Sequence, residues 1–174
     1  LAIKDMAGLL RPFDAHDLVR SLKESLSIPI HMQTHATTGM SPATNMKAIE
    51  AGIDNIDTSI SSLSMTYGHT ATETMMAIFE GQDRYLDLDL EALEEVSTFF
   101  KDIREKYSEF EGNLKGVDST MLVKQVPGGM LSNLESQLRA NKQEDKIDLV
   151  KDEIPKVRED FGYPPLVTPA SQIV

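Results

Sequence analysis

Short apolar segments followed by amphipathic helical patterns recur along the first half of the chain, and this alternation restricts the fold more than any other feature. Residues 1–5 have the pattern of a strand end, and residues 12–26 carry apolar side chains at helical spacing. Strand patterns at residues 28–32 and 53–60 are each followed by a helical pattern that stops at a glycine. Alternation every 25 to 30 residues or so predicts parallel βα units and an α/β fold.

The second half of the chain has long amphipathic helices in place of the alternation. Helical spacing predicts helices over residues 88–110, 129–141 and 147–161, and Pro155 should bend or break the last of them. Three βα units make only a narrow sheet, whereas a closed barrel of this kind needs eight strands. The pattern alone leaves two architectures open, a small doubly wound domain or a slice of a barrel.

Charge and composition narrow the classes of function. The 174 residues include 17 Lys and Arg, 28 Asp and Glu and no Cys, which gives a formal charge of −11. A negative surface repels phosphate backbones and anionic lipids, and the lack of Cys excludes disulfides and thiolate metal sites. No apolar run approaches the roughly 20 residues that span a bilayer. We expect a cytoplasmic protein that binds neither nucleic acid nor membrane, with solvated acidic helix faces at residues 91–95 and 105–111.

The chain opens on a strand pattern without Met, so we expect it to be a fragment of a longer protein. In parallel βα folds the active face is built where strands end, and the strand ends here are polar. Alternation puts His31, Gln33 and His35 on one face of their strand. Two imidazoles and an amide suit either a divalent metal site or a hydrogen-bonded strand end, and spacing does not decide between them.

Three other features have ordinary explanations when taken alone. Lys4 has only donors, so it binds a cation only if it is carboxylated, and a substrate-binding or surface charge is the simpler interpretation. Thr168, between Val167 and Pro169, has the pattern of a turn residue. The Pro-Gly-Gly at residues 127–129 is typical of a loop that leads into a helix, because a phosphate-binding loop would also need its Lys.

Several long motifs in one order resemble the carboxyltransferase domain shared by pyruvate carboxylase, the α subunit of oxaloacetate decarboxylase and the carboxyltransferase subunit of transcarboxylase. They cover nearly the whole chain, at residues 3–10, 31–39, 48–52 with 57–58, 125–134 and 164–174. The family fold is a TIM barrel followed by a helical funnel. The resemblance implies that residues 1–86 are later βα units of the barrel and that residues 87–174 form the funnel region.

The resemblance also implies roles for individual residues. Lys4 matches the family's carboxylated lysine, which binds a catalytic divalent metal, usually zinc. The family's two ligand histidines fall on Gln33 and His35, so Gln33 is a departure, and an amide oxygen is a poorer zinc ligand than imidazole. Thr168 matches the proton shuttle between biotin and the pyruvate methyl group, and Ser171 matches a position near bound biotin.

The implied reaction moves a carboxyl group between carboxybiotin and pyruvate or oxaloacetate. Residues 62–73 are more similar to the separate-subunit decarboxylases and transcarboxylase than to single-chain pyruvate carboxylases. The implied partners are a biotin carboxyl carrier protein or domain and further copies of the chain. The alternative is a non-catalytic relative or assembly module in which Gln33 marks a disabled metal site.

Overall fold

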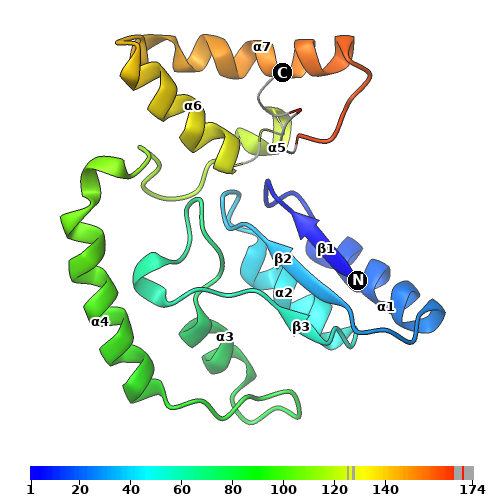
Figure 1. The fold of residues 1–174 in the computed structure, drawn as a ribbon. Coiled ribbons are helices and arrows are strands. Elements are labelled where there is room, and N and C mark those ends of the chain that lie inside the picture. Colours follow the sequence, from blue (N-terminus) through cyan, green and yellow to red (C-terminus); the bar gives the residue numbers. More distant parts are fainter. Residues whose placement is uncertain (125, 127, 167–169, 171–174) are drawn as a thin grey trace.

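A parallel sheet of three strands organises the first half of the protein. The structure is a computed structural model that describes residues 1–124, 126, 128–166 and 170 (Figure 1). The strands follow the order β1–β2–β3 and comprise Ala2–Asp5, His31–Thr34 and Asn55–Ile56. All pairings are parallel, and Lys4 lies opposite Gln33. The predicted parallel βα units are confirmed.

The third strand is shorter than the predicted segment of residues 53–60, which is a correction to the sequence analysis. Only Asn55–Ile56 forms a ladder with β2. Further along, Ser59 forms a parallel bridge with Ala71, and its amide donates to the Thr70 carbonyl at 3.0 Å. The backbone after β3 therefore pairs with the residue directly before the next helix. It does not continue along β2, which ends at Thr34.

Helices cover one face of this sheet. α1 (Pro12–Ser25) and α2 (Ser41–Glu50) each have a proline in their first turn, where a missing N–H costs nothing, and α3 (Thr72–Phe79) follows β3 (Figure 1). All three lie close to their predicted positions. The side chains between α1, α2 and the sheet form a closed apolar core of Val19, Ile30, Met32, Ala48 and Ile53, all at most 1% exposed.

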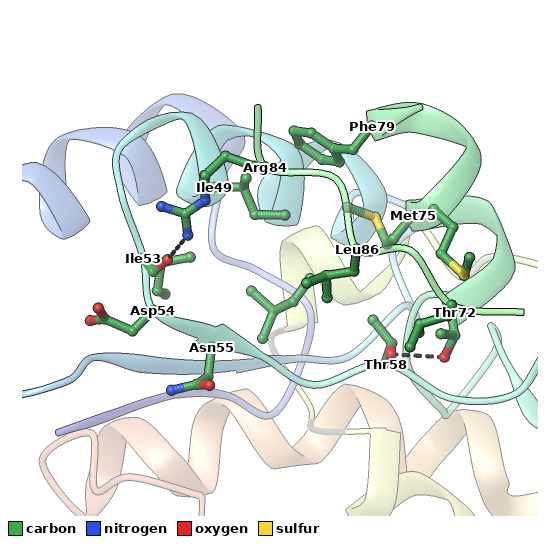
Figure 2. Close-up of a pocket in the computed structure, with 13 residues that line it drawn as sticks. Ile49, Ile53, Asp54, Asn55, Thr58, Thr72, Met75, Phe79, Arg84 and Leu86 are labelled. Atoms are coloured by element: carbon green, nitrogen blue, oxygen red, sulfur yellow. Dashed lines mark hydrogen bonds between the residues drawn. The ribbon is translucent and has the colours of Figure 1, made fainter. Parts of the chain in front are cut away.

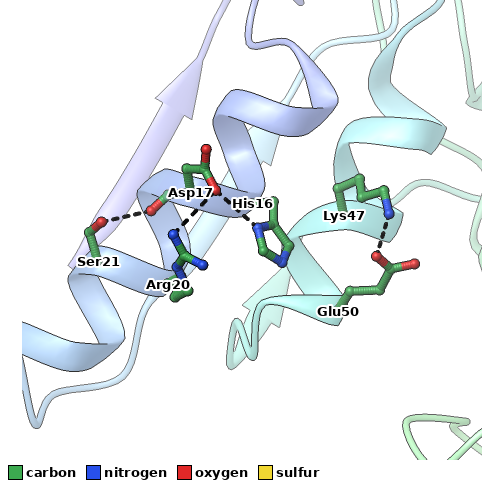
Figure 3. Close-up of polar contacts among 6 residues, drawn as sticks. All are labelled: His16, Asp17, Arg20, Ser21, Lys47 and Glu50. Atoms are coloured by element: carbon green, nitrogen blue, oxygen red, sulfur yellow. Dashed lines mark hydrogen bonds and ion pairs between the residues drawn. The ribbon is translucent and has the colours of Figure 1, made fainter.

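The outer surfaces of α1 and α2 carry local polar contacts (Figure 3). Asp17 contacts His16 at 3.2 Å and Arg20 at 3.7 Å, and Lys47 pairs with Glu50 at 2.6 Å. Such solvent-facing pairs each contribute about 0 to 1 kcal/mol. We therefore treat these surfaces as ordinary solvated helix faces.

The second half is helical, as predicted, with small differences at the ends. The long helix α4 ends earlier than the predicted residue 110, since a separate 3₁₀ turn, Ser108–Phe110, follows it. Asp89 caps α4, accepting the amides of Glu91 at 3.0 Å and Ala92 at 3.1 Å. The helices of this half are α4 (Leu90–Lys106), α5 (Met121–Lys124), α6 (Gly128–Ala140) and α7 (Ile147–Asp160).

Pro155 does not break α7, contrary to one form of the prediction. The helix continues from Ile147 to Asp160 with the proline inside it. The residue before it, Ile154, is 2% exposed and belongs to a second apolar core, with Met121, Val126, Met130, Leu131 and Leu166. The apolar face of α7 packs into this core, and that packing offsets the hydrogen bond that a proline removes.

Two further observations concern the surface. The acidic residues 91, 94, 95, 105 and 109 are exposed, which confirms the predicted solvated helix faces, while Glu111 is only partly exposed and pairs with Arg104. Within the described residues, we find no helix that combines the length and the apolar character needed to cross a membrane.

Candidate functional site

The face of the sheet away from the helices is polar and open. Along β2 the side chains of Met32 and Thr34 are buried, whereas those of His31 and Gln33 are partly exposed. This confirms the predicted alternation of faces. An open pocket of about 580 Å³ lies on the polar face and is lined by Leu1, Ala2, Lys4, Pro29, His31, Gln33 and Asp57. Nε2 of His31 in β2 lies 2.7 Å from Oδ1 of Asp57, the residue that follows β3.

Asp5, the neighbour of Lys4, fixes the loop that follows β1. Its carboxylate accepts the amides of Leu9 at 2.8 Å and Leu10 at 3.0 Å, and the hydroxyl of Thr34 at 2.7 Å. Because side chains alternate along a strand, Lys4 lies on the opposite face from Asp5. Lys4 therefore borders the open face, whereas Asp5 binds the loop. Sequence reasoning missed this anchoring role of Asp5.

The loop after β1 approaches the end of β2 closely at Gly8. This residue has φ +68°, and a Cβ built on it would lie 2.4 Å from the carbonyl oxygen of His35. The hydroxyl of Thr38 also donates to the Gly8 carbonyl. Only glycine satisfies both the backbone conformation and the contact.

His35 is held by the loop between β3 and α3. Its Nδ1 lies 2.6 Å from the backbone carbonyl of Tyr67. Because a carbonyl only accepts, this bond places the hydrogen on Nδ1 and leaves the lone pair on Nε2. The ring of His69 lies beside His35, with 4.8 Å between ring centroids. Burial and the proximity of His35 lower the pKa of His69, whose Nε2 is buried and has no partner among the described residues.

The side chain of Tyr67 connects this loop to the helical half. Its hydroxyl donates to Oε1 of Glu135 in α6 at 3.2 Å, and Oε2 of Glu135 accepts the amide of Asn113 at 3.0 Å. Burial, followed by the nearby carboxylate of Glu135, raises the pKa of Tyr67 to about 12. The phenol therefore remains a hydrogen-bond donor at neutral pH.

Comparisons with known proteins identify families and relatives that match this chain. The family described as HMGL-like matches residues 1–100, and the family described as Conserved carboxylase domain matches residues 121–174. The chain is 47% identical to the methylmalonyl-CoA carboxyltransferase 5S subunit of Propionibacterium freudenreichii subsp. shermanii, covering 100% of the chain and 35% of that subunit. The chain belongs to the HMGL-like family.

Two more relatives support the assignment. A pyruvate carboxylase subunit of Methanocaldococcus jannaschii is 48% identical, over 100% of the chain and 31% of that protein. The carboxyl transferase domain of Rhizobium etli pyruvate carboxylase is 34% identical with a TM-score of 0.92, over 99% of the chain and 29% of that structure. The chain thus spans about a third of the length of these relatives.

The predicted metal ligands can be compared with the geometry of the site. The described residues contain no group of three or more His, Asp or Glu arranged to hold a metal ion. Lys4 and Gln33 are partners in the sheet, and His35 lies two residues after Gln33, directly beyond the end of β2. An ammonium, an amide and one imidazole lack an anionic donor, but carboxylation of the exposed Lys4 would supply one. With that modification the set would contain donor types that suit a divalent ion.

Thr168 and Ser171, predicted for the carboxyltransferase chemistry, lie outside the described residues. Their roles stay predictions from the sequence motif.

A second pocket, of about 280 Å³, contains none of the predicted site residues (Figure 2). Its walls are mainly apolar and come from α2, β3, α3 and residues 84–88. At its edges, Arg84 donates to the carbonyl of Ile53, and the hydroxyls of Thr58 and Thr72 lie 2.8 Å apart. Arg84 and the two threonine hydroxyls thus each have at least one hydrogen-bond partner at the edge of the pocket.

Proposed function

We propose that the chain forms part of an enzyme that transfers a carboxyl group between carboxybiotin and pyruvate or oxaloacetate. The observation that carries this proposal is the pairing of Lys4 with Gln33 beside an open pocket. His35 directly follows β2, and its Nε2 takes no part in the bond to Tyr67. The names of the relatives, carboxyltransferase and pyruvate carboxylase, support the same reaction class.

The fold proposed for the whole enzyme is a TIM barrel followed by a helical funnel. Residues 1–86 would supply later βα units of the barrel, and residues 87–174 would supply funnel helices. A parallel sheet with helices on one face and a polar pocket on the other supports this assignment, since barrel strands have helices outside and a polar mouth inside.

The proposed metal ligands are carboxylated Lys4, His35 and Gln33. Carboxylation replaces one N–H hydrogen of the neutral amine by CO₂ and releases that proton, which gives an anionic carbamate oxygen donor. Gln33 offers a neutral amide oxygen where imidazole is the better zinc ligand, which shifts preference toward harder ions. A divalent ion bound here would act as a Lewis acid that stabilises negative charge developing on the pyruvate oxygen.

Thr168 is the proposed proton carrier of the reaction. In the direction that forms oxaloacetate, its hydroxyl accepts a proton from the pyruvate methyl group and passes its own proton to the biotin ring that has lost its carboxyl group. A hydroxyl can do this without ever carrying a net charge, because it donates and accepts at once. Ser171 is proposed to contact biotin, which arrives on a carrier domain or subunit, and the enzyme is proposed to act as a homo-oligomer.

A second candidate function follows from Gln33. If the amide does not support metal binding, the chain is a non-catalytic relative or assembly module. The test compares oxaloacetate decarboxylation, with free biotin present, in the full-length protein and its Thr168→Ala variant. We expect loss of turnover with unchanged folding, and Thr98→Ala, an exposed threonine of α4, serves as the matched control. Equal turnover in Thr168→Ala and wild type would contradict the proton-carrier role.

A further inference from the structure

The loop between β3 and α3 is built around an unusual backbone. Met65 has φ 62° and Thr66 has φ 48°, a region that residues other than glycine rarely adopt and that a β-branched residue adopts least readily. Two short hydrogen bonds close the loop, from the Met65 amide to the His69 carbonyl and from the Gly68 amide to the Met65 carbonyl, both 2.7 Å. Strained loops of this kind persist only where the surrounding structure holds them, and they concentrate at functional sites.

The strained turn directs two successive carbonyl groups at the end of β2. The carbonyl of Tyr67 accepts from Nδ1 of His35 at 2.6 Å, and the carbonyl of Gly68 accepts the amide of Ala36 at 2.9 Å. The loop therefore clamps the ring of His35 and the backbone of the next residue together. Within the described residues, the Tyr67 carbonyl is the hydrogen-bond partner recorded for the His35 ring.

The same loop is fastened at its other side to the helical half. In Figure 1 it extends from the sheet toward the start of α6. The Tyr67 hydroxyl bonds to Glu135, a carboxylate only 9% exposed, and the tyrosine ring packs against the second apolar core. At Gly112 a Cβ would lie 2.4 Å from Cε2 of Tyr67 and 2.9 Å from Oε2 of Glu135. Tyr67, Gly112 and Glu135 come from three segments of the chain, and they pack too closely for a side chain at position 112.

We propose that Tyr67 and Glu135 are positioning residues, through which the helical half holds the imidazole of His35 in one tautomer and orientation. This proposal rests on the proposed function only in giving His35 a ligand role. The phenol fixes the loop, the loop aims its carbonyl at Nδ1, and Nε2 is then free of the proton that would prevent it from donating electrons. Glu135 accepts from both Tyr67 and the Asn113 amide, which needs both of its oxygens.

The test uses two conservative variants of the full-length protein. Tyr67→Phe removes only the hydroxyl, and Glu135→Gln leaves one accepting oxygen where the structure uses two. Tyr107→Phe is the matched control, because Tyr107 is an exposed tyrosine whose ring lies beside Phe110 and Lys106. The histidine side-chain ¹⁵N signals report the tautomer, and His35 is assigned by the signals lost in His35→Gln.

We expect the wild type and Tyr107→Phe to show His35 protonated at Nδ1, and both Tyr67→Phe and Glu135→Gln to show a growing Nε2-protonated form. Unchanged tautomer populations in both variants would overturn the proposal. Zinc affinity of the carbon dioxide-treated protein is the second readout, and we expect about a tenfold loss in the two variants. If the tautomer shifts while zinc binding is absent or unchanged, the positioning role stands and the ligand role of the proposed function fails.

Discussion

The two faces of β2 contrast sharply within four residues. On the covered face, Met32 and Thr34 are at most 1% exposed and contribute to a closed core under α1 and α2. On the open face, His31 and Gln33 are partly exposed and border an open pocket. Side-chain alternation therefore places residues that stabilise the fold on one face of β2 and residues of the candidate site on the other. Substitutions on the covered face should change stability, and those on the open face should change metal binding.

The largest expected effect is on the covered face. Met32→Ala should lower the free energy of unfolding by about 2 to 5 kcal/mol, because it leaves a cavity beside Ile30 and Val19. Gln33→Ala, one residue along the strand, should change it by less than about 0.5 kcal/mol. Urea denaturation of the two variants in the full-length protein measures both. Similar losses would show that the open face is also packed for stability.

The second effect concerns the loop that joins the two strand ends. Gly8→Ala should cost more than about 2 kcal/mol of stability, since positive φ and the approach to the His35 carbonyl act together. Gly52→Ala is matched for positive φ but meets nothing within 4 Å, and should cost only about 1 kcal/mol. Equal melting temperatures for the two variants would contradict the close approach at Gly8.

On the open face, Gln33→His should increase the zinc affinity without changing the free energy of unfolding of the metal-free protein. An imidazole in register with carboxylated Lys4 should tighten zinc binding by about tenfold or more, equal to about 1.4 kcal/mol. Competition with a chelator measures the affinity, and thermal unfolding of the metal-free protein provides the stability check. A zinc affinity equal to that of wild type would show that position 33 is not a ligand.

The smallest effect lies far from both faces, in the pair formed by Arg104 and Glu111. The hydrogen bond from Arg104 lowers the pKa of Glu111 below its ordinary value of 4.5. The pair therefore stabilises the fold above about pH 4.5, and this contribution disappears as the pH falls through the lower folded-state pKa. Glu111→Gln should remove less than about 1 kcal/mol at neutral pH and a smaller amount at pH 2. Melting curves at the two pH values, with Glu109→Gln as control, test the sign.

The periodic patterns of the sequence predicted the local features of the fold, such as strand faces and helix ends. The alternation of His31, Met32, Gln33 and Thr34 was enough to assign each side chain to a face, and proline and glycine positions located most helix ends. The contact of Tyr67 with Glu135 was not predictable, because it joins residues 68 positions apart and has no periodic pattern. Pro155 inside α7 was misjudged for a related reason, since the core that holds Ile154 is assembled from distant segments.

The three-stranded sheet has a consequence for handling the protein. Within the described part of the chain, β1 and β3 each have a strand partner on one side only, which leaves two rows of backbone donors and acceptors without a neighbouring strand. Such margins readily recruit a strand from another molecule. A preparation containing these 174 residues alone should therefore self-associate as its concentration rises, and supplying strands that cover both margins should suppress that association.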